Sequence, residues 1–263
     1  MTPYNKSVLT LLSLVGAITA YGQTSLLPTA DTMLDQQGEF YDPPTFFGAS
    51  PDFSVGSYSL GEGTRRRSLI RFDLSSLSGQ TVSSASLTLV RDGSGGTFTN
   101  QTVSLFATSS PNGGWTESTA AWAWQSYRAT HWAGSDGLGT AGTDYLNGVL
   151  ATATVNSTDS FGPRVTFTLN SAGITALQSW IDSPSSNAGF LLRADGLEAA
   201  GLGIAQFRSR ESLVTADWPV LEVSTIPEPS SFAFIAGILL SAACHFRCGQ
   251  HQPIKPHHEA HAT

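Results

Sequence analysis

Short runs in which apolar residues alternate with polar or small ones place the strongest constraint on the fold of this chain. Each run is bounded by Gly, Pro, Ser, Asn or Asp, and such alternation is the period of a strand with one buried face. The runs predict strands at residues 68–72, 84–90, 102–107, 150–155, 165–169, 189–193, 204–209 and 220–223, with weaker candidates at 29–34 and 53–60.

One segment has helical spacing instead. Over residues 171–181, apolar residues three and four positions apart share one face, and Asn170 or Ser171 can cap the first turn. Many short strands with closely spaced turns and a single helix favour an all-β fold, a jelly-roll type β-sandwich with one short helix.

The N-terminus carries a short apolar segment. Lys6 precedes the apolar run 8–18, and the small residues Ala20 and Gly22 follow it. This order is typical of a secretory signal peptide, and the run is too short for a membrane-spanning helix. We therefore predict a signal peptide over residues 1–22, with a buried N-terminal helix as the alternative.

A second apolar segment, residues 230–246, follows Pro227, Glu228 and Pro229 and precedes Arg247. At about 1.5 Å per residue its length suits a thin hydrocarbon core. The basic residue after the segment predicts a cytoplasmic C-terminus, with the preceding chain on the outside of the membrane.

The Pro-Glu-Pro motif, the short apolar helix and the basic residue together resemble the PEP-CTERM sorting signal of bacterial exported proteins. The resemblance implies recognition and cleavage by an exosortase, in Gram-negative bacteria that make extracellular polysaccharide. It assigns a sorting segment to residues 226–247, which lies in the inner membrane before processing, and a polar tail to residues 248–263. A plain C-terminal membrane anchor is the alternative.

The segment between the two ends, residues 23–225, excludes several kinds of chemistry. It contains no Lys, no Cys and a single His, His131. A Cys nucleophile, a Lys Schiff base, a disulfide framework and a zinc site built from several His or Cys ligands are therefore excluded. The net charge of −7 argues against nucleic acid and anionic lipid as partners. We predict a protein that is not an enzyme and holds no cofactor.

The segment 66–89 reads RRSLIRFDLSSLSGQTVSSASLTL and resembles the DNRLRE domain, a β-sandwich related to carbohydrate-binding modules. The matching residues are Arg67, Leu69-Ile70, Phe72-Asp73-Leu74-Ser75 and 84–89. Further pieces follow the order of that family, at residues 30–32, 115–117, 122, 207–211 and 219–221. The resemblance covers residues 28–224 and implies a β-sandwich domain over residues 23–225.

Charged residues on the resembling strands suggest two roles. Buried charges need partners, so an ion-pair network within the sandwich is one prediction, for example between Arg71 and Glu211. The candidates for this network are Arg71, Asp73, Arg208, Arg210 and Glu211. The other role is an arginine cluster that faces acidic sugars, because Arg recognises carboxylates in bidentate fashion. The resemblance also includes modules implicated in binding alginate-type glycans. Arg65 and Arg66, in the densest positive run, are the candidates for this contact.

Aromatic residues are concentrated in residues 115–132. Sugars present apolar C–H faces that stack on flat indoles, so exposed Trp residues on a β-sandwich can form a glycan platform. Trp115 and Trp122 match family positions and are expected in the core. Trp124 and Trp132, with Tyr127, are the candidate ligand-binding aromatics.

Two Gly-Asp loops, at residues 92–96 and 136–144, contain the oxygen ligands that calcium prefers but lack the spacing of a known calcium loop, so ordinary turns are favoured.

The sequence as a whole predicts an exported cell-surface or matrix protein that binds polysaccharide without catalysis. The alternatives are a structural matrix or adhesion protein without a defined glycan, and a polysaccharide hydrolase or lyase. Hydrolysis would need a carboxylate pair in a cleft, and lyase chemistry a base such as His131.

Overall fold

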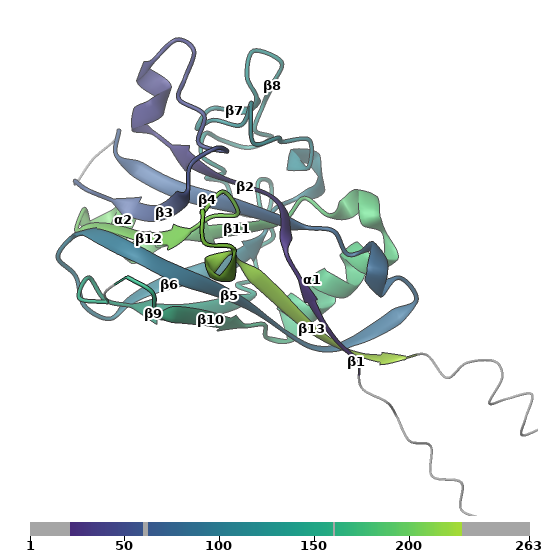
Figure 1. The fold of residues 1–263 in the computed structure, drawn as a ribbon. Helices are drawn as coiled ribbons and strands as arrows, with labels where there is room; N and C mark the ends of the chain where they lie inside the picture. Colours follow the sequence, from purple (N-terminus) through teal and green to yellow (C-terminus); the bar gives the residue numbers. More distant parts are fainter. Residues whose placement is uncertain (1–21, 60–62, 160, 228–263) are drawn as a thin grey trace, which may run out of the picture. The chain divides into compact units, whose positions relative to one another are not determined.

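The computed structural model describes residues 22–227, except 60–62 and 160 (Figure 1). The predicted signal peptide, most of the predicted sorting segment and the polar tail lie outside the described residues. Within the described part of the chain, no helix is long and apolar enough to cross a membrane.

Strands make up most of the regular structure. They are β1 (Gly22–Leu26), β2 (Pro28–Asp35), β3 (Asp52–Ser57), β4 (Arg65–Phe72), β5 (Gln80–Gly96), β6 (Gln101–Ala107), β7 (Trp124–Ser126), β8 (Thr130–His131), β9 (Ala151–Val155), β10 (Arg164–Thr168), β11 (Phe190–Arg193), β12 (Gly203–Arg208) and β13 (Val220–Pro227). The prediction of an all-β fold is confirmed, whereas the jelly-roll order of the strands stays a prediction.

The long strand β5 holds the curled sheet together. Its residues 86–90 pair with β10, and its residues 91–96 pair with β12. The sheet runs in the order β1-β13-β5-β12-β3-β4-β11-β6-β9, with β10 added on β5 and β2 on β4. The pairs β1–β13, β6–β11, β3–β12 and β2–β4 are antiparallel.

The main hydrophobic core lies inside the curled sheet and contains Ile70 and Phe72 of β4. Leu69 points to the opposite face of β4, because successive side chains of a strand alternate between faces. There it joins Phe106 and Leu191 in a second hydrophobic cluster. The strand β4 is therefore buried on both faces.

Residues 108–149, which we call the covering loop, form the outer wall of the second cluster. Figure 1 shows this teal segment above β4 and β11. Its apolar residues in the cluster are Trp115, Ala120, Trp122, Trp132, Leu138 and Tyr145. The covering loop, rather than a second large sheet, thus buries the outer face of β4 and its neighbours.

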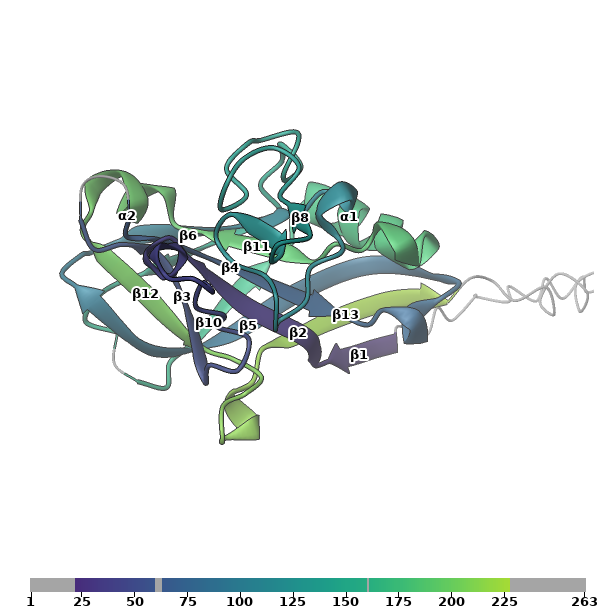
Figure 2. The same cartoon turned by 90° about the horizontal axis from the view of Figure 1, so that it is seen from above.

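The predicted helix is confirmed as α1 (Ser171–Asp182). The Asn170 side chain caps it by accepting a hydrogen bond from Gly173 N at 3.0 Å. The same side chain donates through Nδ2 to Val149 O at 2.7 Å, which ties α1 to the end of the covering loop beside it (Figure 2). A second helix, α2 (Asp195–Ala200), was not predicted, because six residues are too few to show a periodic pattern.

The buried carboxylate of Asp144 organises the covering loop. It accepts hydrogen bonds from the backbone N–H groups of Gly134, Ser135 and Thr140 at 2.7, 2.9 and 2.8 Å. These donors occupy the oxygens that a calcium ion would need. In the other Gly-Asp loop, Asp92 forms an ion pair with Arg208 at 2.6 Å.

Replacement of Asp144 by Asn is expected to lower the free energy of unfolding by about 2–3 kcal/mol, because one acceptor oxygen becomes a donor that faces a buried N–H group. Urea denaturation of both proteins would measure the change. The exposed Asp136, on the same loop, provides the control, and Asp136→Asn should leave the midpoint unchanged. Equal midpoints for the two variants would contradict the role of Asp144.

Candidate functional site

The hairpin formed by β7 and β8 presents an aromatic surface. Trp124 and His131 lie opposite each other in the hairpin. Their rings stack with centroids 3.7 Å apart and an interplanar angle of 29°. Tyr127 meets the indole edge-on at 5.8 Å. We call Trp124, Tyr127 and His131 the hairpin platform. In Figure 1 the hairpin stands at the top of the described domain.

The platform is held in place by a residue far away in the sequence. Glu39, in the 3-10 helix η1 (Gln37–Phe40), accepts hydrogen bonds from Trp124 Nε1 and from Ala123 N, both at 3.1 Å. His131 Nδ1 lies 2.9 Å from the carbonyl oxygen of Ala123, which requires the proton on Nδ1. The indole therefore has a fixed orientation while it remains partly exposed.

Polar groups border the platform. Arg128 and Asp42 form an ion pair at 2.8 Å, with side chains that are 68% and 73% exposed. The Tyr127 hydroxyl donates a hydrogen bond to the Asp42 carboxylate, and this bond raises the pKa of Tyr127. Arg128 occupies the left-handed region at φ 57°, which closes the tight turn between β7 and β8. An aromatic surface with donors and acceptors at its border suits a ligand rich in hydroxyl groups.

The structure separates the other Trp residues from this platform. Trp132 is only 5% exposed, and its Nε1 donates to the carbonyl oxygens of Ala121 and Trp122 at 3.0 and 2.9 Å. Trp132 is thus a core residue and offers no ring face to a ligand. Trp115 and Trp122 are buried in the same cluster, as expected from the family positions they match.

The run Arg65-Arg66-Arg67 does not form an open cationic patch. Arg66 pairs with Asp35 at 2.9 Å, and Arg67 is buried in a bidentate pair with Glu198 at 3.0 and 2.7 Å. Arg65 is partly exposed and has no ion-pair partner among the described residues. It lines a pocket of about 280 Å³ together with Arg67, Arg193, Asp195, Glu198 and Ala199.

The predicted pair between Arg71 and Glu211 is wrong. Arg71 Nη2 donates to Gly113 O at 2.7 Å, and the guanidinium lies 4.3 Å from the ring centroid of Trp115. Arg71 and Leu69 lie on the same face of β4, which the covering loop buries, so Arg71 meets this loop instead. Glu211 contacts Arg210 at 3.3 Å.

The remaining residues of the predicted network have other partners. Arg208 pairs with Asp92, and Arg210 also approaches Glu117 at 3.3 Å. Asp73 has no ion pair in the described part of the chain. Its carboxylate accepts a hydrogen bond from Ser75 N at 2.9 Å, which lowers the pKa of Asp73.

Three carboxylates that the sequence did not group meet in the fold. Ligand oxygens of Asp31, Glu117 and Glu211 lie within 4.8 Å of one another. Asp31 is only 1% exposed, and this burial raises its pKa to about 8, while Arg210 N donates to its Oδ2 at 2.9 Å. An acid so deeply buried is out of reach of a substrate, whereas the side chains of Glu117 and Glu211 are 26% and 22% exposed.

A family model for carbohydrate-binding module family 96 matches residues 22–189. The chain belongs to this family. Family 96 membership confirms the prediction of a domain related to carbohydrate-binding modules, and the specific resemblance to the DNRLRE domain stays a prediction. No match is found among curated proteins.

The family 96 match covers β1 to α1 and ends before β11. The strands β11, β12 and β13 complete the sheet beyond it, since each lies between two neighbours in the strand order. The hairpin platform falls inside the matched residues. The sequence signal for the platform was the density of aromatics, whereas its anchor Glu39 had no signal because it lies 85 residues away from Trp124.

Proposed function

We propose that this family 96 protein is an exported, non-catalytic polysaccharide-binding protein that stacks sugar rings on the hairpin platform. The observation that carries the proposal is the partly exposed indole of Trp124, fixed by Glu39 on one side and by the stacked His131 on its face. A flat aromatic ring attracts the apolar C–H face of a sugar, and a ring that is already oriented loses little freedom when a ligand binds.

The border of the platform supplies the polar contacts. Asp42 carries acceptor oxygens, Arg128 carries donors, and both side chains are exposed. Sugar hydroxyls both donate and accept, so each can bridge such a pair. His131, the base that lyase chemistry would use, has its Nδ1 on the carbonyl oxygen of Ala123 and its ring stacked on Trp124, so we assign it to the platform rather than to catalysis.

Export and sorting form the second part of the proposal. The predicted signal peptide over residues 1–22 supports export, and the PEP-CTERM-like residues Pro227, Glu228, Pro229 and Arg247 support recognition by an exosortase. Before processing, residues 226–247 would lie in the inner membrane. The protein would finally occupy the periplasm, the cell surface or the extracellular matrix. A jelly-roll β-sandwich is the strand arrangement proposed for the exported domain.

The substitution Trp124→Ala is expected to weaken polysaccharide binding by about tenfold or more, because it removes the central aromatic of the platform. Affinity electrophoresis would measure binding, in gels that contain alginate, pectin, xylan or the exopolysaccharide of the host. The domain spanning residues 22–227 contains both hydrophobic clusters and every described strand, so it suits this assay. Gels with and without calcium would test the dependence on that ion.

Trp218 provides the matched control. It is also partly exposed and its Nε1 is also hydrogen-bonded, to Ser212 O at 2.8 Å, but it lies outside the platform. The domain with Trp218→Ala should migrate like the unmodified domain in the polysaccharide gels. Absence of retardation on every polymer would contradict the proposal and favour a structural matrix role, and shortening of a polymer would point to an enzyme.

A further inference from the structure

A pocket of about 320 Å³ lies where β4 ends, outside the hairpin platform. Its walls come from the end of β4, the 3-10 helix η2 (Ser75–Leu77), α1 and the 3-10 helix η4 (Pro184–Ser186). We call it the β4 pocket. Its polar lining includes Arg71, Asp73 and Asn187, and its apolar lining includes Phe72 and Trp180.

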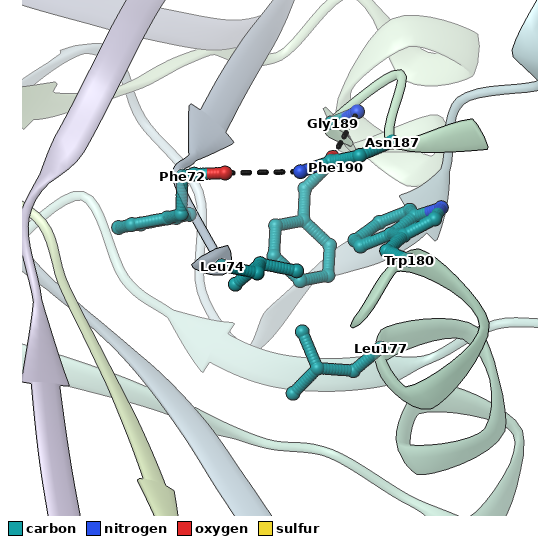
Figure 3. Close-up of a pocket in the computed structure, with 7 residues that line it drawn as sticks. All are labelled: Phe72, Leu74, Leu177, Trp180, Asn187, Gly189 and Phe190. Carbon is teal, nitrogen blue, oxygen red and sulfur yellow. Dashed lines mark hydrogen bonds between the residues drawn. The ribbon is translucent and has the colours of Figure 1, made fainter. Parts of the chain in front are cut away.

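An apolar crevice adjoins the β4 pocket and shares Phe72, Leu74, Trp180 and Asn187 with it. Figure 3 shows Trp180, Phe190 and Leu74 packed below Phe72 in a crevice too narrow to admit water. The rings of Trp180 and Phe190 meet edge-to-face at 4.9 Å. Asn187 closes the rim, since its Nδ2 donates to Phe72 O at 2.9 Å and its Oδ1 accepts from Gly189 N at 3.1 Å.

The polar wall offers both donors and acceptors. The Arg71 guanidinium is fixed by Gly113 O and by the ring of Trp115, and its Nε is buried with no acceptor in the described part of the chain. The exposed Asp73 carboxylate faces the same pocket, and the hydrogen bond from Ser75 N keeps it ionised. One cation and one anion thus line the pocket.

We propose that the β4 pocket binds one neutral pyranose unit of the glycan, a proposal that rests on the proposed function. A pyranose has apolar C–H groups for the apolar lining and hydroxyls that accept from Arg71 and donate to Asp73. The volume is at the small end of the range for ligand pockets, which suits a single sugar unit. Because the charges of Arg71 and Asp73 cancel, the lining carries no net charge and suits a neutral sugar better than a uronic acid.

A pocket of this kind complements the platform. The platform is an open aromatic surface that can stack any sugar ring, whereas the β4 pocket selects a unit by its hydroxyl groups. A polymer that engages both sites of one molecule gains affinity because the second contact is intramolecular.

The test is titration of the domain spanning residues 22–227, with ¹⁵N-labelled Trp, against the methyl glycosides of glucose, mannose, galactose and xylose, and against glucuronate. The indole N–H signal of Trp180 reports on the β4 pocket, and that of Trp124 on the platform. One neutral glycoside should shift the Trp180 signal in a saturable way. Ser75→Phe should abolish the shift, because Ser75 is exposed and its replacement fills the pocket.

Two further variants complete the experiment. Asp73→Asn keeps an oxygen for Ser75 N but removes the charge, and should weaken the sugar by about tenfold; it also serves if Ser75→Phe does not fold. Trp124→Ala should leave the Trp180 shift unchanged.

The proposal is overturned if no neutral glycoside shifts the Trp180 signal, if glucuronate is preferred, or if neither pocket variant reduces the shift. Polymer retardation that depends on Trp124 would still support the proposed function in those cases, and its absence would remove that function as well.

Discussion

Replacement of Arg67 by Ala is expected to destabilise the domain by about 3–5 kcal/mol, the usual cost of leaving one buried charge without its partner. The side chains of Arg67 and Glu198 are only 6% and 7% exposed. Arg67 also donates through Nη1 to Gly137 O at 2.7 Å and lies 5.3 Å from the ring of Trp122. One guanidinium therefore joins β4, α2 and the covering loop.

Urea denaturation would measure this loss. Arg128→Ala is the matched control, because it breaks an arginine–carboxylate pair that is largely exposed and should cost less than about 1 kcal/mol. Glu198→Ala should cost as much as Arg67→Ala, since it strands the other buried charge. Similar costs for Arg67→Ala and Arg128→Ala would show that burial does not determine the effect.

The free energy of unfolding is expected to fall as the pH rises from about 4 to 8. Burial raises the pKa of Asp31 from its ordinary 3.8 to about 8, and the neighbouring Glu211 and Glu117 act in the same direction. The folded state therefore holds a proton that the unfolded state releases in this window, and stability decreases wherever the folded state binds more protons. The hydrogen bond from the Arg210 backbone N–H to Asp31 lowers this pKa and opposes the effect only in part.

Asp31→Asn should remove most of this pH dependence and stabilise the domain by a few kcal/mol at pH 8. The amide keeps an oxygen for Arg210 N and places an N–H group where the acid carried its proton. Urea midpoints measured from pH 5 to 9 would test this. Asp136→Asn, which changes an exposed acid, should follow the unmodified domain at every pH. A steep loss of stability retained in Asp31→Asn would contradict the role of Asp31.

The strands and α1 could be predicted because each has a local pattern. Alternation marks β5, β6 and β10, and the cap at Asn170 marks the start of α1. The burial of both faces of β4 could not be predicted from its sequence, because Leu69 and Phe72 lie on opposite faces and the outer face is buried by a segment distant in sequence. The covering loop supplies the second face, and it has no periodic pattern.

The candidate site was predictable only in part, because local sequence shows aromatic residues but does not show which of them the fold buries. Aromatic density pointed to Trp124 and Tyr127, but it pointed equally to Trp132, whose burial is decided by the fold of the covering loop. Partners distant in sequence, such as Glu39 for Trp124 and Glu198 for Arg67, are separated by 85 and 131 residues. No local pattern can reveal such pairs.

The pairing of β13 has a mechanical consequence for a protein proposed to be tethered through its C-terminus. The strand β13 ends at Pro227 and lies between β1 and β5 in the sheet. Tension applied along β13 acts on its backbone hydrogen bonds to β1 and β5, and those of the antiparallel pair with β1 run perpendicular to the strand. These bonds share the load together instead of opening one at a time, so the tethered end resists being pulled out when a bound polymer is dragged by flow.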